Sequence, residues 1–472
     1  MSARPRPGAT RSGETARRTS GRRRIAEWAE RPLWSLHLVL GLTALLTTFG
    51  LAMVLSASAV ESYVGGGSAY TFFVQQLLGV ILGLFAFYLA MRLPVRTIRM
   101  LSFPAFVAAV VMLILVLIPG IGTEIQGSRR WFDVAGISFQ PSELAKVALV
   151  LWGAHMLTLR AGPARSTREL LVPVVPGALV MCVLVVLQPN LSTAITLAII
   201  LMSLLWYIGF DLRILGAIVG AGVATAVVLT FTAGYRVNRV RVLFNPGDDP
   251  QGLGYQSRQA KYALASGGWF GEGLGQSTSK WSYLPNSYND FIFAIIGDEL
   301  GILGSMSVIA LFAAVVVLGI RIARRCADPF LGLVAAVATT WIGAQATINI
   351  GYVIGLLPVT GLQLPLISYG GTSTALMLFV FGLVANAARH EPRAIAAIEK
   401  TGGGRISRLL RLPVPQLSGG AVEQSRGRNP NTQSANTTRS QRSSRRSGPP
   451  VPEHRDVEVR SRSTRTTGRR PS

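Results

Sequence analysis

One carboxylate, Asp290, stands where a polar stretch of more than fifty residues runs into a hydrophobic segment, within LPNSYNDFIFAIIGDELG at residues 284–301. An acid at the water-facing edge of a membrane span stays hydrated enough to titrate, while it remains within reach of the head group of a lipid-bound substrate. A short acid in this place can also cap the following helix by accepting its free amide hydrogens. The sequence leaves the capping role open and favours a general base.

Two further acids, Asp298 and Glu299, follow in the same hydrophobic segment. On a helix, Glu299 lies about 13 Å deeper than Asp290 and on roughly the opposite face. The paired carboxylates of glycosidases lie about 5 to 9.5 Å apart, so Asp290 and Glu299 do not form a hydrolase pair. A reaction with one base and a leaving group neutralised by cations fits better, and transfer of a sugar from a pyrophosphate is such a reaction.

Several positively charged residues are predicted to lie on the same side of the membrane as Asp290. Each one alone is typical of a solvated surface, but as a group with few acids among them they form a plausible anion site. They are Arg129, Arg130, Arg236, Arg239, Arg241, Arg258, Lys261 and Lys280.

A fourth segment opens with FQPSELAK, where Glu143 and Lys146 share one face of a helix. Helix capping by Glu143 and a simple ion pair with Lys146 are the structural alternatives, whereas charges at membrane depth are candidates for a polar cleft.

Gln188, Pro189 and Asn190 form a tight turn. The stretch LLPVTGLQLPLISYGGTS at residues 356–373 breaks a membrane-like composition with prolines and paired glycines, which predicts irregular backbone lining protein or a cavity.

The residues named above lie in or between long apolar segments without charges, since 50% of the chain is hydrophobic and only 14% is charged. These segments must form the helices that position them. The sequence therefore predicts an all-α integral membrane protein with ten transmembrane helices. The predicted spans are residues 35–56, 70–91, 101–119, 142–159, 171–187, 190–208, 213–233, 291–320, 330–353 and 372–388. A membrane domain over 35–390 would include a large extracytoplasmic loop, 234–290, between spans seven and eight.

Positive charge fixes the expected orientation. With both termini on one side, the short loops of that side carry ten arginines and the opposite short loops carry only Arg129 and Arg130. Both ends are therefore predicted to be cytoplasmic, which places Asp290 outside. The retained first span is not expected to be a signal peptide.

Most of the net charge of +24 lies in two tails, 1–34 and 391–472, both expected to be disordered and basic. Such tails favour anionic lipid or an acidic protein partner over nucleic acid, since they contain almost no aromatic residues. The two cysteines and four histidines are scattered without the spacing of metal ligands, so no histidine or cysteine metal site is expected.

Five motifs in order resemble the SEDS family of membrane glycosyltransferases, the FtsW, RodA and SpoVE group, over residues 35–390. They are RRWF with FQPSELAK; QPNLSTA; YRVNRV with FNPGDDPQGLGYQ; GLGQSTSKWSYLPNSYNDFIFAIIGDELG; and LPVTGLQLPLISYGGTS. The chain departs from the family pattern at Asn190, where an Asp is usual, and at Tyr288, where a His is usual. Gly247 and Lys261 replace a Trp and a Leu. The lost acid and imidazole leave a single-base scheme intact.

The resemblance implies polymerisation of lipid II into β-1,4-linked peptidoglycan strands at the outer face of the bacterial plasma membrane, with Asp290 as the catalytic base. The substrate-binding residues it implies are Arg130, Glu143, Lys146, Arg236, Arg239, Gln256, Lys280, Ser368, Tyr369 and Gly370. Lys280 resembles division-type members, so the expected place is the division septum. The expected partners are a class B penicillin-binding protein transpeptidase and other division proteins. No resident cofactor is implied with certainty; a divalent cation, Mg²⁺ or Mn²⁺, at the pyrophosphate is left open.

Two alternatives come from other classes of protein. A transporter that flips lipid II predicts polar residues through the full depth of the membrane and a site open to either side. A scaffold for division proteins would act through the basic tails and is compatible with an enzyme.

Overall fold

The structure is a computed structural model that describes residues 32–64, 68–125, 128–134, 137–160, 167–211, 213, 215–217, 220–222, 224, 252–280, 287–401 and 412–415. Contacts divide the chain into Met1–Ser418 and Gly419–Ser472, and all described residues belong to the first unit. The basic residues at both ends of the chain, most of the predicted seventh span and the first part of the predicted outer loop lie outside the described residues.

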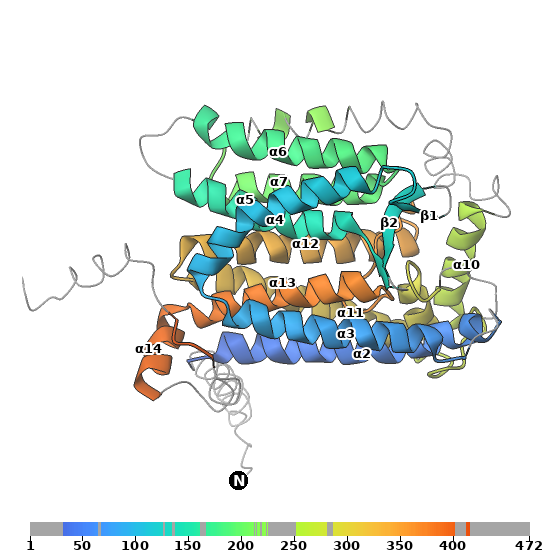
Figure 1. Cartoon of the computed structure of the whole chain (residues 1–472). Helices are drawn as coiled ribbons and strands as arrows, with labels where there is room; N and C mark the ends of the chain where they lie inside the picture. Colours follow the sequence, from blue (N-terminus) through green and yellow to red (C-terminus); the bar gives the residue numbers. More distant parts are fainter. Residues whose placement is uncertain are drawn as a thin grey trace, which may run out of the picture. The chain divides into compact units, whose positions relative to one another are not determined.

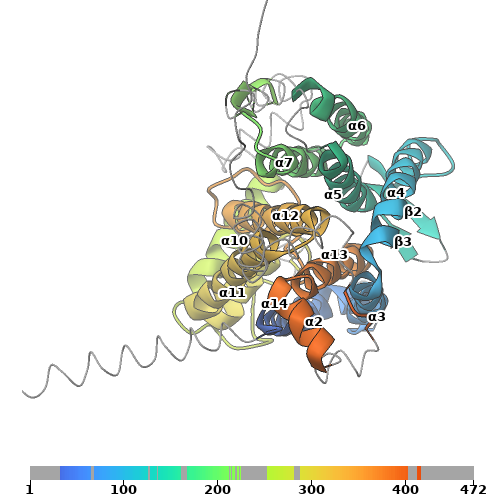
Figure 2. The ribbon, with the colours of Figure 1, turned by 90° about the vertical axis from the view of Figure 1, so that its left-hand side faces the viewer.

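The described part is predominantly helical (Figures 1 and 2). Its helices are α2 (Trp34–Val64), α3 (Thr71–Arg92), α4 (Val95–Leu115), α5 (Pro141–Arg160), α6 (Thr167–Leu187), α7 (Leu191–Tyr207), α10 (Leu253–Ser266), α11 (Ile292–Arg325), α12 (Pro329–Val353), α13 (Gly371–Arg389) and α14 (Pro392–Thr401).

Six of the described helices are long and apolar enough to cross a membrane, namely α2, α3, α4, α11, α12 and α13. Helices α5, α6 and α7 coincide with three more predicted spans, and α6 and α7 contain shorter apolar segments. The chain is a multi-pass membrane protein. The number of ten spans stays a prediction, because residues 213–233 are largely outside the described part.

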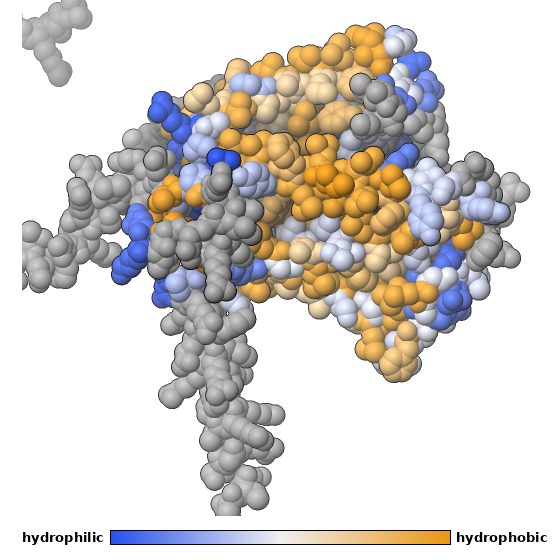
Figure 3. All heavy atoms as spheres, turned by 60° about the horizontal axis from the view of Figure 1, so that its bottom comes forward, coloured by the Kyte–Doolittle hydropathy of each residue, from blue (hydrophilic) through white to orange (hydrophobic). Residues whose placement is uncertain are grey.

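The outer surface of the bundle suits a bilayer. Hydrophobic side chains cover most of the helical surface seen in Figure 3, and hydrophilic ones gather toward its ends. On α3 and α4, for example, Phe85 is 64% exposed and Phe103 is 55% exposed. Backbone polar groups of such helices are satisfied internally, so these apolar faces can lie in lipid without cost.

The expectation of an all-α fold is wrong in one place. Residues predicted as an outer loop form a three-stranded antiparallel sheet of β1 (Thr123–Ile125), β2 (Ser128–Val134) and β3 (Ile137–Phe139), in the order β1-β2-β3. The central strand SRRWFDV includes aromatic and β-branched residues, which favour strands. The sheet and α10 lie at one end of the long helices, and α14 lies at the other (Figure 1).

The expectation of a disordered tail from residue 391 also needs correction. Residues 392–401 form α14, whose Ala394, Ile395 and Ile398 are buried. These positions share one helix face, so packing of an apolar stripe explains why the helix forms. Pro392 at its first position is compatible with a helix start.

Small residues bring α3 and α13 into close contact. A Cβ on Gly79 would lie 2.5 Å from the Cα of Gly371, and one on Gly83 would lie 2.9 Å from the Cα of Ala375. The Asn386 amide at the far end of α13 donates to the carbonyls of Ala90 and Leu93, each at 2.9 Å. The absence of side chains at Gly79 and Gly83 therefore allows α3 and α13 to approach closely.

Helix α11 is broken at Gly301, whose φ of 67° and ψ of −165° are not helical. A loop at residues 267–273 fills the break: Glu272 and Gly273 donate to the carbonyls of Asp298 and Glu299 at 2.9 and 3.0 Å, and the Ile302 amide donates to Gly268 at 2.9 Å. The loop therefore replaces the hydrogen bonds that the helix loses. Gly301 therefore marks a break in the helix.

Candidate active site

Asp290 lies in the turn that leads into α11. The N-cap of this helix is Phe291, with no side-chain cap hydrogen bond. The Asp290 carbonyl accepts from the Asn349 amide at 3.0 Å and from the Tyr352 hydroxyl at 2.8 Å. Those two groups also donate to the Leu362 carbonyl. The backbone of Asp290 is thus fixed against α12 and against the irregular segment before α13.

The carboxylate of Asp290 faces that irregular segment. A Cβ on Gly361 would lie 3.3 Å from Oδ2 of Asp290, and Gly361 has a φ of 75°. The Asp290 side chain is half-buried. A larger residue at position 361 would be strained and would crowd the carboxylate, so the local sequence keeps space beside it.

Glu143 and Lys146 form an ion pair in the first turns of α5, with Nζ 2.7 Å from Oε1. Lys146 is fully buried and lies 5.1 Å from the centre of the Trp341 ring, which adds a cation–π contact. Glu143 keeps a partly exposed carboxylate, and its Oε2 accepts from the Ser373 hydroxyl at 3.2 Å. The ion pair expected between Glu143 and Lys146 is confirmed, and it connects α5 to α12 and α13.

The tight turn before α7 joins the same region. The Asn190 side chain accepts from the Thr193 amide at 3.3 Å and caps α7, which confirms a structural role for this residue. Its amide lies 3.5 Å from the Ser142 hydroxyl, beside Glu143 in sequence. Ser192 donates to the Thr360 carbonyl, next to Gly361. The first turns of α5, α7 and α11 therefore meet around residues 360–371.

Residues 362–370 are irregular and buried in protein, as predicted. Gly50, in the middle of α2, lets this segment approach, since a Cβ there would collide with the Leu366 carbonyl. Ser368 is buried and its hydroxyl accepts from the Leu364 amide at 2.8 Å. The Gly370 amide donates to Gln76 at 2.9 Å. Ser368 and Gly370 thus shape the segment through hydrogen bonds within the protein.

Tyr369 belongs to an aromatic cluster beside Asp290. Phe72 stacks on Tyr288 with ring centres 4.7 Å apart, and Tyr369 meets Phe72 and Tyr288 edge-on at 5.2 and 5.5 Å. Burial, together with the nearby Glu61, Tyr369 and Asp290, raises the pKa of Tyr288 to about 12. Tyr288 therefore keeps its proton and can donate a hydrogen bond, but it does not replace an imidazole as a base.

Lys280 is not brought to this site. Its Nζ lies 3.2 Å from Oε1 of Glu299 and also donates to the Gly275 carbonyl, and both side chains are buried. Glu299 accepts two further hydrogen bonds from Ser56, at 2.6 and 2.8 Å. Asp298 accepts from Ser266 and Ser277. Asp298 and Glu299 are thus engaged by other partners, whereas the Asp290 carboxylate lies beside Gly361.

The other predicted site residues are distributed as follows. Arg130 is half-buried in β2, and Gln256 is half-buried in α10. Arg236 and Arg239 lie outside the described residues. Sequence reasoning missed Gln76, Asn349, Tyr352 and Ser373. Gln76 gave a signal, because two consecutive glutamines interrupt the apolar sequence of α3.

The arrangement favours single-base chemistry. Glu143 is paired with Lys146, Asp298 is bound by serines, and Glu299 is paired with Lys280. Among the described residues, no group of three or more His, Cys, Asp and Glu residues could hold a metal ion. A half-buried acid whose backbone is fixed and whose carboxylate faces a glycine suits proton removal from a bound hydroxyl.

Comparison with known proteins identifies relatives over the whole membrane region. A family model described as "Cell cycle protein", covering FtsW, RodA and SpoVE, matches residues 36–393. A probable peptidoglycan glycosyltransferase FtsW of Mycobacterium tuberculosis is 54% identical over 395 residues, which cover 84% of this chain and 75% of that protein. The stage V sporulation protein E of Bacillus subtilis is 38% identical and covers 74% of this chain and 95% of its own length.

Solved structures show the same fold. A chain of a peptidoglycan synthase complex, described as coordinating polymerization and crosslinking, aligns with a TM-score of 0.62 at 26% identity and covers 75% of this chain and 97% of its own length. The rod shape determining protein RodA of Thermus thermophilus aligns with a TM-score of 0.56 at 25% identity, covering 75% and 96%.

Proposed function

This chain belongs to the FtsW, RodA and SpoVE family and is a peptidoglycan glycosyltransferase, and we propose that it polymerises lipid II with Asp290 as the general base. The single observation that carries this assignment is the placement of Asp290. Its backbone is held by Asn349 and Tyr352, its carboxylate faces Gly361, and the neighbouring acids of α11 are engaged by serines and a lysine.

In the proposed reaction, Asp290 accepts the proton of the acceptor sugar's 4-hydroxyl while that oxygen attacks the anomeric carbon of the donor. A new carbon–oxygen bond forms as the bond to pyrophosphate breaks, and the lipid pyrophosphate leaves with the electron pair. Displacement from the opposite face inverts an α-linked donor into a β-1,4 linkage. Positive charge stabilises the leaving group.

We assign this charge to Arg130 of β2, and to Arg236 and Arg239 on sequence grounds. Lys146 is directed to Glu143, and Lys280 is buried with Glu299. Glu143, held by Lys146 and Ser373 at the start of α5, is proposed to accept a hydrogen bond from the substrate. Gln256, Ser368, Tyr369 and Gly370 would line or shape the sugar site. A divalent cation, Mg²⁺ or Mn²⁺, would enter with the pyrophosphate, and assays with and without EDTA test that addition.

We also propose a class B penicillin-binding protein as the partner. The similar chain in the peptidoglycan synthase complex, which joins polymerization with crosslinking, supports this partner. Both ends of the chain are proposed to be cytoplasmic, with Asp290 outside and the protein at the division septum. The described residues do not specifically favour a lipid II transporter or a pure scaffold.

The test uses purified full-length protein with its partner and lipid II. Asp290→Asn should abolish glycan synthesis, whereas Glu124→Gln, an exposed acid in the outer sheet, should leave it unchanged. Both variants need the thermal stability of the wild type. Normal polymerisation by folded Asp290→Asn would refute the assignment, and lipid translocation in liposomes without any polymer would favour a transporter.

A further inference from the structure

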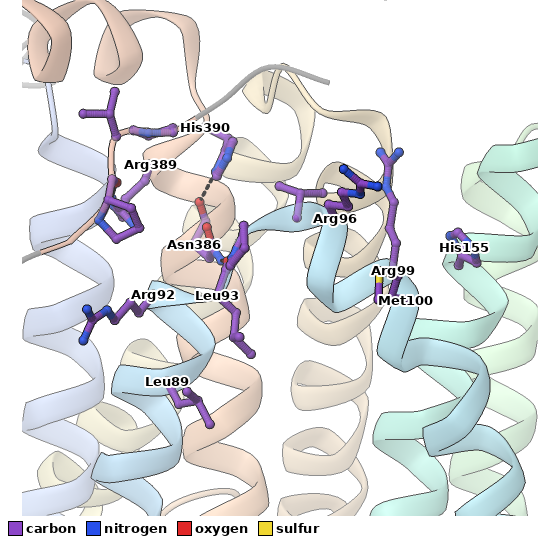
Figure 4. A pocket seen from close by; sticks show the side chains of 15 residues that line it. Leu89, Arg92, Leu93, Arg96, Arg99, Met100, His155, Asn386, Arg389 and His390 are labelled. Carbon is purple, nitrogen blue, oxygen red and sulfur yellow. Dashed lines mark hydrogen bonds between the residues drawn. The ribbon is translucent and has the colours of Figure 1, made fainter. Parts of the chain in front are cut away.

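A cavity of about 1020 Å³ lies far from Asp290, at the end of the helices that carries α14. Figure 4 shows its walls, which come from the end of α3, the start of α4 and the end of α13, with His155 of α5 at one side. Residues 413–415 close another side. The arginine distribution assigns this end of the bundle to the cytoplasm.

The lining of the cavity is strongly basic. It includes four arginines and two histidines, and none of the described residues that line it is acidic. The basic residues are Arg92, Arg96, Arg99, Arg389, His155 and His390. Asp328, behind Arg99, is bound to it at 2.9 Å and also caps α12. Among the described residues, Asp328 therefore pairs with one of the four arginines that line the cavity.

Arg389 is a buried cation whose hydrogen bonds go to neutral groups. Its side chain is 2% exposed, and its terminal nitrogens donate to the carbonyls of Met91, at 2.8 Å, and Pro413. The Nε atoms of Arg389 and Arg99 are buried without a hydrogen-bond partner. A buried charge is costly unless an opposite charge and hydrogen bonds compensate it. An anion in this cavity would therefore compensate the charge of Arg389.

The remaining wall is apolar and opens toward the membrane-facing side. Leu89, Leu93 and Met100 line it. Met100 is 67% exposed and Leu89 is 42% exposed, and the exposed Phe103 continues the apolar surface along α4. A ligand that combines an anionic head with a hydrocarbon tail matches both parts of the cavity.

We propose that this cavity binds the phosphate head group of an anionic membrane lipid from the cytoplasmic leaflet. Basic pockets between helices on this side of a membrane suit such head groups. The phosphate lies among Arg92, Arg96 and Arg389, and the acyl chains follow Leu89 and Met100. The site is separate from the polymerisation chemistry and does not depend on it.

The experiment measures lipid retained by the purified full-length chain in native mass spectrometry, after exchange into phosphatidylglycerol or phosphatidylcholine. One phosphatidylglycerol should remain bound under conditions that remove phosphatidylcholine. The double variant Arg92→Gln/Arg96→Gln should bind it roughly 30-fold more weakly, at about fivefold per arginine. The matched control, Arg324→Gln/Arg325→Gln, removes two exposed charges from the end of α11 outside the cavity and should bind as the wild type does.

Competition with other phosphate compounds distinguishes a lipid head group from a free phosphate. Soluble glycerol phosphate should not displace the lipid, and its displacement at equal concentration would assign the site to a free phosphate. Preferential retention of a polyprenyl pyrophosphate would assign it to a substrate-like lipid. Equal losses in the two double variants, or no retained lipid in the wild type, would overturn the proposal. Unchanged thermal stability of both double variants separates lost binding from misfolding.

Discussion

Lys280 and Glu299 form a buried ion pair, with Nζ 3.2 Å from Oε1, that joins the segment before α11 to the part of α11 that precedes Gly301. Their partners, the Gly275 carbonyl and the Ser56 hydroxyl, complete the pair on both sides. Each charge therefore depends on the other, which makes the pair testable by single and double substitution.

Lys280→Met should destabilise the protein by about 3 to 5 kcal/mol, because it leaves the Glu299 carboxylate buried and uncompensated. Lys280→Met/Glu299→Gln should recover most of that loss, as measured by thermal unfolding in detergent. The exposed pair Arg129–Glu124, at 3.1 Å, is the control, and removing it should cost less than about 1 kcal/mol. A single variant as stable as the wild type would contradict a buried pair.

Ser373→Ala should reduce the polymerisation rate by about tenfold, because hydrogen bonds to charged groups contribute about 1.5 to 3 kcal/mol. The Ser373 hydroxyl orients Glu143 from the first turn of α13. Glu143→Gln should be slower still, since it also removes the charge opposite Lys146. Rates are measured on lipid II with folded variants. Ser307→Ala, an exposed serine of α11, should have no effect.

Gly301→Ala should prevent normal packing of the outer loop. The glycine adopts φ 67°, and an added Cβ would lie 2.5 Å from backbone atoms of Trp269 and Gly271. Thermal stability should fall and polymerisation should be lost with it. Gly41→Ala, in α2 with no atom within 4 Å of the new Cβ, is the matched control and should be neutral or slightly stabilising.

Tyr288→Phe tests the phenol beside Asp290. Burial raises the pKa of Tyr288 from 10.0 to about 12, so above pH 10 the unfolded chain loses this proton before the folded chain does. Stability should therefore decline as pH rises from about 10 toward 12, and Tyr288→Phe should remove part of that decline. Thermal unfolding measured across this range checks the slope. An identical slope in both proteins would contradict the raised pKa.

Deletion of residues 416–472 should leave polymerisation intact, whereas deletion from residue 391 should destabilise the protein. The longer deletion removes α14, and burial of each isoleucine contributes about 1.5 to 3 kcal/mol. The measurements are thermal stability and activity in vitro. Equal stability of the two truncated proteins would contradict the packing of Ile395 and Ile398.

The long apolar runs were sufficient to predict most of the described helices, since a segment of that length and composition has few alternatives in a membrane. Asp290 and the Glu143–Lys146 pair were also predictable, because each follows from local sequence. The break at Gly301 was not, because apolar residues continue on both sides of it. The sheet was missed because its strands are short and lie in a stretch read as a loop.

Contacts between distant segments were beyond the reach of sequence patterns. The Lys280–Glu299 pair, the bond from Ser373 to Glu143 and the clamp of Asn349 on Asp290 each join residues from different elements. Their partners are chosen by packing in three dimensions. A span pattern shows that a polar residue is costly in its helix, but it does not show which neighbour compensates it.

Residues 267–273, inserted into the break of α11, form a bridge between the two parts of that helix. Residues 292–300 are hydrogen-bonded to that loop and are separated from the rest of α11 by Gly301. Because the same loop also accepts hydrogen bonds from the Ile302 and Leu303 amides, it bridges the break, so a change in the loop would reach both parts of α11.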